Sequence, residues 1–145
     1  MKIRKMETKD LETVALQERN IFSDYWSLDA FRESLNNKQA YLVVSVDEQD
    51  EPTGYACVYT ALDEAELMNI AVFPEYRGQN LGDALMLHLI SYLKTVEIHF
   101  FYLEVRQSNV PAQSLYMKHG FEIVGKRKNF YEMPREDAWV MTREI

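Results

Sequence analysis

The sequence predicts a mixed α+β fold, with a central twisted sheet of about seven strands flanked by about four helices. Two observations carry this prediction. The candidate elements follow the order β, α, α, β, β, β, α, β, α, β, β, so one strand–helix–strand unit lies among hairpins. Strands joined by short loops pair antiparallel, whereas strands joined by a crossover helix pair parallel. The sheet should contain both kinds of pair, which excludes a doubly wound parallel fold.

The first part of the chain predicts a strand followed by two helices. Lys2–Met6 is a short strand candidate, and Thr8 and Ser27 are the predicted N-caps of the helices. Apolar residues three and four positions apart give each helix one buried face. These residues are Leu11, Val14 and Ala15 in the first helix, and Leu28, Phe31 and Leu35 in the second.

Three strands and a long helix follow. Ala40–Val46 and Gly54–Leu62 are rich in β-formers, and the polar loop between them favours an antiparallel hairpin. Glu66–Phe73 is a third strand, which ends at Pro74. Leucine then recurs every fourth residue, a spacing typical of a helix. The leucines are Leu81, Leu85, Leu89 and Leu93.

The last third of the chain predicts a strand, a short helix and two closing strands. Phe100–Val105 is the strand, and Pro111–His119 is the helix. Proline suits the first turn of a helix and glycine suits its end, as Gly120 does here. Phe121–Gly125 and Ala138–Thr142 complete the predicted sheet.

Composition narrows the class of protein. The 145 residues, 47% hydrophobic and 27% charged, suit one globular domain over residues 1–145. A net charge of −7 argues against nucleic-acid binding and is compatible with a cationic partner. One cysteine excludes an internal disulfide, and with three scattered histidines it makes no metal site. The sequence shows no signal peptide and no membrane-spanning run, so we expect a cytoplasmic protein.

The segment between the strand Glu66–Phe73 and the helix from Leu81 is the most informative. Gly78 and Gly82 lie at the turn, where backbone N–H groups without helical partners and the positive end of the helix dipole favour an anion such as pyrophosphate. No P-loop and no Rossmann glycine motif occurs, which disfavours an unrelated nucleotide-binding domain. From the residues alone, a glycine turn before a helix is more often an ordinary turn than an anion site.

The same segment resembles a family motif. Arg77-Gly78-Gln79-Asn80-Leu81-Gly82 is similar to motif A, Q/R-x-x-G-x-G/A, of the GNAT superfamily of acetyl-CoA-dependent N-acetyltransferases. The later segments that resemble this superfamily are Leu103–Arg106, Ser108-Asn109, Leu115-Tyr116 and Gly120-Phe121. Phe22–Ser27, Asn129–Tyr131 and Arg135–Ala138 are similar to segments of its bacterial RimI-type enzymes, which acetylate the N-terminal alanine of a small-subunit ribosomal protein.

The resemblance implies acetyl-CoA as cosubstrate. It assigns cofactor contacts through backbone groups to three residues of the strand, Ile70, Ala71 and Val72. The other residues to which it assigns cofactor contacts are Arg77, Gly78, Gln79, Asn80, Leu81, Gly82, Asp83 and Asn109. Two of these depart from the pattern. Asn80 replaces the first glycine of the motif, and asparagine tolerates a left-handed backbone better than other residues. Asp83 stands where the subfamily often has a basic residue, so we expect it to repel a pyrophosphate.

The resemblance also assigns the chemistry. Glu104 corresponds to the general base and Tyr116 to the general acid that protonates the leaving thiolate. From the residues alone, the favoured interpretation of Glu104 is a solvated edge glutamate, and that of Tyr116 is a core aromatic. Strand alternation places Glu104 on the same face as Phe100 and Tyr102, where a carboxyl can lose solvent.

Two loops are the predicted acceptor site. Trp26, in Phe22–Ser27, and Tyr131, in Asn129–Arg135, are the predicted acceptor contacts, or alternatively anchors of their loops. An α-amine has a pKa of about 7.7–8.0, against about 10.4 for lysine, so an N-terminal acceptor asks less of the base.

We therefore expect direct transfer of acetyl to the N-terminal α-amine of a protein, for which a basic ribosomal protein is the candidate. The enzyme should be a monomer or weak homo-oligomer that binds no nucleic acid and no membrane. The alternatives are an enzyme for a small amine or a lysine, and a non-catalytic acetyl-CoA-binding module. A covalent intermediate on Cys57 is disfavoured, because its apolar strand predicts a buried thiol.

Overall fold

The computed structural model describes residues 1–145 and is built around one seven-stranded sheet in the order β1-β2-β3-β4-β5-β7-β6. The strands are β1 (Lys2–Lys5), β2 (Ala40–Val46), β3 (Pro52–Ala61), β4 (Glu64–Val72), β5 (Phe100–Arg106), β6 (Glu122–Glu132) and β7 (Arg135–Glu144). Only β4 and β5 pair parallel, and the other neighbours pair antiparallel. The predicted mixed sheet is confirmed.

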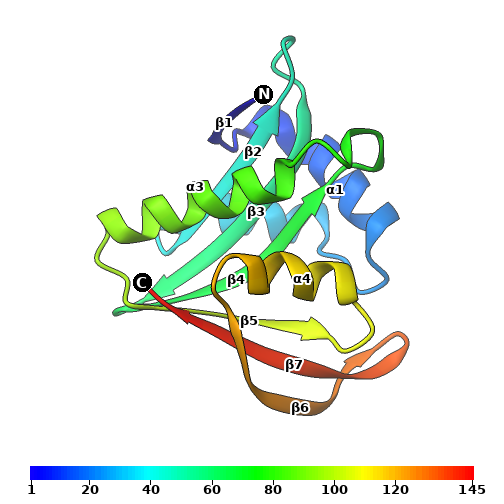
Figure 1. Ribbon diagram of the computed structural model, residues 1–145. Helices are drawn as coiled ribbons and strands as arrows, with labels where there is room; N and C mark the ends of the chain where they lie inside the picture. The colour runs from blue at the N-terminus through cyan, green and yellow to red at the C-terminus, as the bar shows by residue number, and fades with distance from the viewer.

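Four helices cover the sheet in two layers, with α3 and α4 in front of it and α1 behind it in Figure 1. They are α1 (Leu11–Ile21), α2 (Leu28–Leu35), α3 (Leu81–Thr95) and α4 (Val110–Lys118), with short 3₁₀ turns η1 (Thr8–Asp10) and η2 (Pro74–Tyr76). No helix has the length and apolar character needed to cross a membrane.

Each layer of helices has its own apolar core. Leu85, Leu89 and Leu93 of α3 pack with Phe101 and Leu103 of β5 in the larger core. A smaller core on the other face joins α1 and α2 to β2 and β3. The α1–α2 core includes Ala71 and Phe73 at the end of the β4 segment but no residue of β5 or β7. The face of β5 on the α1–α2 side is therefore not covered by this core and can contribute to a functional site.

The predicted helix boundaries are mostly confirmed by hydrogen bonds. Ser27 Oγ accepts from the Ala30 N–H at 3.1 Å and caps α2. Gly120 follows α4 with φ of +87°, a backbone conformation that favours glycine. The predicted cap at Thr8 is wrong. Thr8 begins η1, the residue at its N-cap is Glu7, and the Asp10 carboxylate accepts from the Glu7 N–H at 2.8 Å.

The C-terminal hairpin is longer than the sequence predicts. β6 and β7 extend to Glu132 and from Arg135, so the predicted loop Asn129–Arg135 is wrong; only Met133 and Pro134 lie between the strands. β6 is an edge strand, and most of its side chains are exposed on both faces. Such a strand has no alternation of apolar and polar residues for a sequence analysis to detect.

A β-bulge in β4 opens the sheet. Cys57 of β3 faces Asn69 and the adjacent Val58 faces Leu67, so Met68 is an extra, unpaired residue in β4. Bulges bend a strand and increase its twist. β4 and β5 pair only from Glu64 to Glu66, and beyond that point they diverge, as Figure 1 shows. Their facing edges have no strand partner along the rest of their length.

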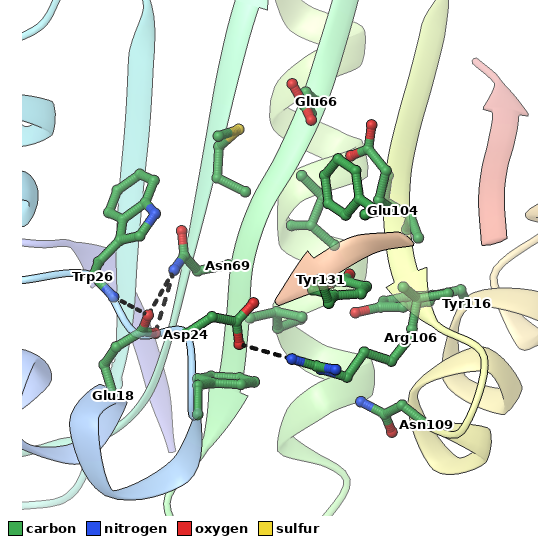
Figure 2. A pocket seen from close by; sticks show the side chains of 17 residues that line it. Glu18, Asp24, Trp26, Glu66, Asn69, Glu104, Arg106, Asn109, Tyr116 and Tyr131 are labelled. Atoms are coloured by element: carbon green, nitrogen blue, oxygen red, sulfur yellow. Dashed lines mark hydrogen bonds and ion pairs between the residues drawn. The ribbon is translucent and has the colours of Figure 1, made fainter. Parts of the chain in front are cut away.

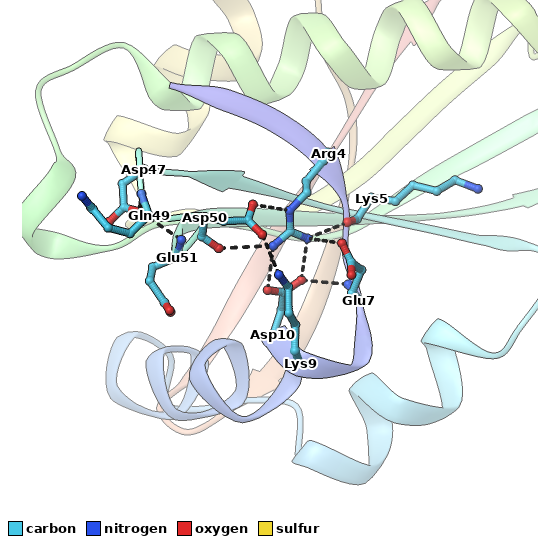
Figure 3. A network of polar contacts seen from close by, with 9 residues as sticks. All are labelled: Arg4, Lys5, Glu7, Lys9, Asp10, Asp47, Gln49, Asp50 and Glu51. Carbon is cyan, nitrogen blue, oxygen red and sulfur yellow. Dashed lines mark hydrogen bonds and ion pairs between the residues drawn. The ribbon is translucent and has the colours of Figure 1, made fainter.

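A polar network holds β1 to the β2–β3 hairpin (Figure 3). The Arg4 guanidinium donates to the Asp10 carboxylate at 2.8 and 3.0 Å and to Asp50 at 2.8 Å. Lys9 donates to the second oxygen of Asp50 at 2.6 Å. These cations hold the pKa of the Asp50 carboxyl at about 2, with Arg4 the largest cause.

Candidate active site

A cavity of about 290 Å³ lies where β4 and β5 diverge (Figure 2). Its walls come from α1 and the α1–α2 connection, from β4 and β5, from the start of α4, and from the end of β6. Five distant segments of the chain therefore meet at the gap that the bulge creates.

Many of the predicted site residues share this cavity. Those that line it are Trp26, Ile70, Glu104, Asn109, Tyr116 and Tyr131. Ala71 and Val72 follow Ile70 along β4, and Arg77, Gly78, Gln79, Asn80 and Leu81 form the turn into α3. The structure thus brings the predicted catalytic and acceptor residues together, with the glycine turn as a separate part of the predicted cofactor site.

Glu104 faces a second carboxyl that the sequence analysis missed. Its side chain is 10% exposed, and the Arg127 guanidinium lies 3.3 Å from its Oε1. Glu66 of β4 also lines the cavity, and its carboxyl lies next to that of Glu104. Burial first, and then Glu104, raises the pKa of Glu66 to about 7. Glu104 is not the solvated edge residue that its strand position alone allowed.

Tyr116 lies on α4 with its ring buried against Phe121, their centroids 5.9 Å apart. Burial raises the pKa of its phenol above the ordinary value, and the neighbouring Tyr131 adds to the effect. The phenol therefore stays protonated at neutral pH, which is the state that a proton donor requires.

Tyr131 is held by a cation that the sequence analysis also missed. The Arg106 guanidinium lies 4.2 Å from the centre of the Tyr131 ring. Arg106 is 3.1 Å from Glu136 and 3.7 Å from Asp24, so it joins β5 to β7 and to the α1–α2 connection. Burial raises the pKa of Tyr131 to about 12. Tyr131 is thus both a cavity residue and an anchored one.

Glu18 organises the opposite wall. It is 1% exposed and accepts from the Trp26 N–H at 2.8 Å, from the Tyr55 hydroxyl at 2.7 Å and from the Asn69 amide. Burial raises the pKa of its carboxyl. Asn69 Oδ1 is buried without a hydrogen-bond partner. Glu18 therefore fixes the positions of Trp26 and Asn69 through neutral donors, with no cation beside it.

The turn before α3 has two left-handed residues. Gly78 has φ of +80°, and Asn80 has φ of +61°, the conformation expected of asparagine in place of a glycine. The Asn80 side chain makes no cap hydrogen bond. A Cβ at Gly82 would lie 3.4 Å from Leu115 of α4, so this glycine faces the helix packing.

Asp83 is paired with Lys118 at the end of α4 and with His119, which follows that helix. Its carboxylate lies 2.8 Å from His119 Nε2 and 3.0 Å from Lys118 Nζ. The hydrogen bond from His119, followed by that from Lys118, lowers the pKa of Asp83. The positive charge of Lys118 offsets the negative charge that Asp83 was expected to present to a pyrophosphate.

Two other features complete the chemistry of the site. The Asn109 side chain accepts from the Ala112 N–H at 3.2 Å and caps α4, which carries Tyr116. Cys57 is buried in β3, and burial raises the pKa of its thiol, so it lacks the thiolate character of a nucleophile. No three His, Cys, Asp or Glu side chains are grouped to hold a metal ion.

Comparison with known proteins agrees with this geometry. Residues 5–121 match the model of the acetyltransferase (GNAT) family. This chain belongs to that family. It is 37% identical over 145 residues to the [ribosomal protein bS18]-alanine N-acetyltransferase of Escherichia coli strain K12, covering 99% of this chain and 97% of the relative. The predicted family is confirmed.

Solved structures support the same assignment of fold. The crystal structure of the ribosomal-protein-S18-alanine N-acetyltransferase from Escherichia coli superposes with a TM-score of 0.90 at 34% identity, covering 99% of this chain and 93% of that one. Arabidopsis thaliana NAA60 in complex with acetyl-CoA shares the fold at 20% identity, with a TM-score of 0.89 and coverage of 99% and 98%. The predicted fold class is confirmed.

Proposed function

We propose that this protein transfers the acetyl group of acetyl-CoA to the α-amine of an N-terminal alanine, with a bS18-type ribosomal protein as the acceptor. The observation that carries the proposal is the cavity at the strand gap, where Glu104 and Tyr116 meet the acceptor wall of Trp26 and Tyr131. The relative named for this activity aligns with almost the whole chain. Because bacteria make ribosomal proteins in the cytoplasm, the proposal includes a cytoplasmic location.

The charge of the cavity suits a basic peptide. Glu18, Asp24, Glu66 and Glu104 line it, and Arg106 is the cation among its lining residues. An N-terminal ammonium and basic residues behind it would be attracted to such a surface. This preference supports a protein N-terminus as acceptor.

Residues of the strand gap and the α3 turn fit acetyl-CoA. The free edge of β4 from Ile70 to Val72 offers backbone groups to the pantetheine arm. The first turn of α3, which follows the left-handed residues Gly78 and Asn80, has N–H groups without intrahelical partners. When bound, acetyl-CoA supplies the thioester whose acyl group is transferred. Lys118 beside Asp83 adds positive charge near this turn.

The proposed reaction begins with the acceptor amine. Glu104 takes a proton from the ammonium, so that the neutral amine can attack the thioester carbonyl carbon. A backbone N–H of β4 stabilises the negative charge that develops on the carbonyl oxygen. As the carbon–sulfur bond breaks, Tyr116 donates its proton to the thiolate, because a thiol with pKa of about 8.5 binds a proton readily.

Parallel assays with three acceptors test this proposal. Acetyl-CoA-dependent thiol release is measured with a basic peptide that has a free N-terminal alanine, with the same peptide blocked at that amine and carrying a lysine, and with a small polyamine. We expect turnover on the free-amine peptide alone. Turnover only on the lysine peptide or the polyamine would overturn the acceptor, and acetyl-CoA binding without turnover on any of them would favour a binding module.

A further inference from the structure

Glu66 and Glu104 come together at the point where the parallel strands separate. Glu66 of β4 is paired in register with Tyr102 of β5, and Glu104 lies two residues further along β5 on the same face. Both carboxyls line the cavity, as Figure 2 shows. Two carboxyls thus face one volume, although one general base would require only one of them.

The charged and titratable neighbours of this pair come from β4, β5 and β6. The Tyr102 hydroxyl donates to Glu66 at 3.3 Å. Arg127 of β6 reaches Glu104, and Tyr131 of the same strand lies on the cavity wall. Glu64, two residues before Glu66, is exposed. The pair has therefore one partly exposed cation and two neutral phenols nearby, which is too little positive charge to cancel two carboxylates.

We infer that Glu66 and Glu104 act as one proton-accepting pair. Glu104 takes the proton of the acceptor amine, and Glu66 is a positioning residue whose carboxyl makes Glu104 bind that proton more tightly. This inference rests on the proposed function, because it assigns the proton of that acceptor. Two carboxylates that share a site bind a first proton more tightly than an isolated carboxylate does.

The pair matches the acceptor better than a single glutamate would. Glu66 has a pKa of about 7 in this site. An α-ammonium loses its proton at a pKa of about 7.7–8.0, within about one unit of that value, whereas an ordinary glutamate at about 4.3 is more than three units lower. A pair that binds its first proton more tightly than an isolated carboxylate therefore accepts the ammonium proton more readily.

The protons balance across the reaction. The ammonium nitrogen gives its first proton to the carboxyl pair, which later releases it to solvent. The nitrogen forms the new bond to the acyl carbon, and the carbon–sulfur bond breaks. Tyr116 protonates the sulfur and is restored by the second proton that leaves the nitrogen. The products are the amide, the free thiol and one proton in solution.

Two measurements on the full chain test the inference, with Glu66→Gln as the variant and Glu64→Gln as its matched control on the same strand. The first is carbon NMR of glutamate side-chain carboxyls as a function of pH without acceptor. We expect a carboxyl that titrates near pH 7, is lost in Glu66→Gln and shifts to lower pH in Glu104→Gln. The second is the pH dependence of kcat with the alanine peptide. We expect the acidic limb to move down by one unit or more in Glu66→Gln and to stay in Glu64→Gln.

Each outcome decides a different point. An acidic limb that is the same in wild type and Glu66→Gln, or a titration near pH 7 that Glu104→Gln leaves unchanged, would overturn the pair. A wild-type protein that fails to acetylate the peptide yet shows the shared titration would overturn the proposed acceptor while supporting the coupled carboxyls. Circular dichroism of each variant checks that the fold is retained.

Discussion

Two regions of this molecule gather carboxylates and treat them in opposite ways. Around Arg4, the carboxylates of Asp10 and Asp50 each lie within 3.0 Å of a guanidinium nitrogen. In the cavity, Glu18 is held by neutral donors and Glu66 faces another carboxyl. In the first region each carboxylate has a cationic partner, whereas in the second region the carboxyls have too few cations to balance their charge.

The difference separates stability from chemistry. A paired charge keeps its charged state and fixes the backbone around it, as Arg4 does for β1 and the β2–β3 hairpin. A carboxyl that lacks a cation has a raised pKa and can exchange a proton near neutral pH, as the pKa of about 7 at Glu66 indicates. Perturbation of the two regions should therefore affect different measurements.

The largest expected effect is on catalysis at Glu104. Glu104→Gln keeps the shape of the side chain but cannot accept a proton, so we expect kcat to fall by about 10²–10⁴-fold. Thiol release on the alanine peptide measures this loss, and urea denaturation should show little change in the free energy of unfolding. Glu122→Gln, on the exposed edge strand, is the matched control. Unchanged turnover in Glu104→Gln would remove it from the reaction.

A smaller effect, and on stability alone, is expected at Arg4. Arg4→Met leaves Asp10, which is 2% exposed, without its cation. Loss of charged hydrogen bonds to a buried carboxylate should lower the free energy of unfolding by about 2–4 kcal/mol, measured by urea denaturation. Lys2→Met, an exposed cation on the same strand, should be close to neutral. A parallel fall in kcat would contradict the separation of the two regions.

The smallest expected effect is the acid sensitivity of Asp50. Its carboxyl has a pKa of about 2 in the folded protein, below the value of about 3.9 for an unfolded chain. A lowered pKa stabilises the folded state when the group is ionised, so the contribution is complete above about pH 5 and is lost as the pH falls through about 2. The stability difference between wild type and Asp50→Asn should shrink over that range. A constant difference would show that the network does not depend on this charge.

Much of the fold could be predicted because its core residues have regular spacing. The leucines of α3 and the alternation in β5 identify elements that bury one face, and both were placed correctly. The end of β6 was missed because an edge strand with little buried surface has no such spacing. Its length comes from pairing with β7 across the two-residue connection Met133-Pro134.

The site was predicted only where a local motif carries it. Glu104, Tyr116 and the turn at Asn80 lie in segments that resemble family motifs. Glu66 and Arg106 were missed as site residues, because their role depends on which strand lies next to them. Glu66 matters through its neighbour Glu104 across the parallel pair, a relation that only the register of β4 and β5 defines.

The extra residue at Met68 has a consequence for which sequence changes this chain can accept in evolution. Leu67 before the bulge and Ile70 after it contact the same core, so removal of Met68 would leave each flanking side chain on its present face. The strand would lose its bend, however, and the gap between β4 and β5 would narrow without any core residue being changed. At this point of the sequence, we therefore expect a substitution to leave the gap in place and the deletion of one residue to narrow it.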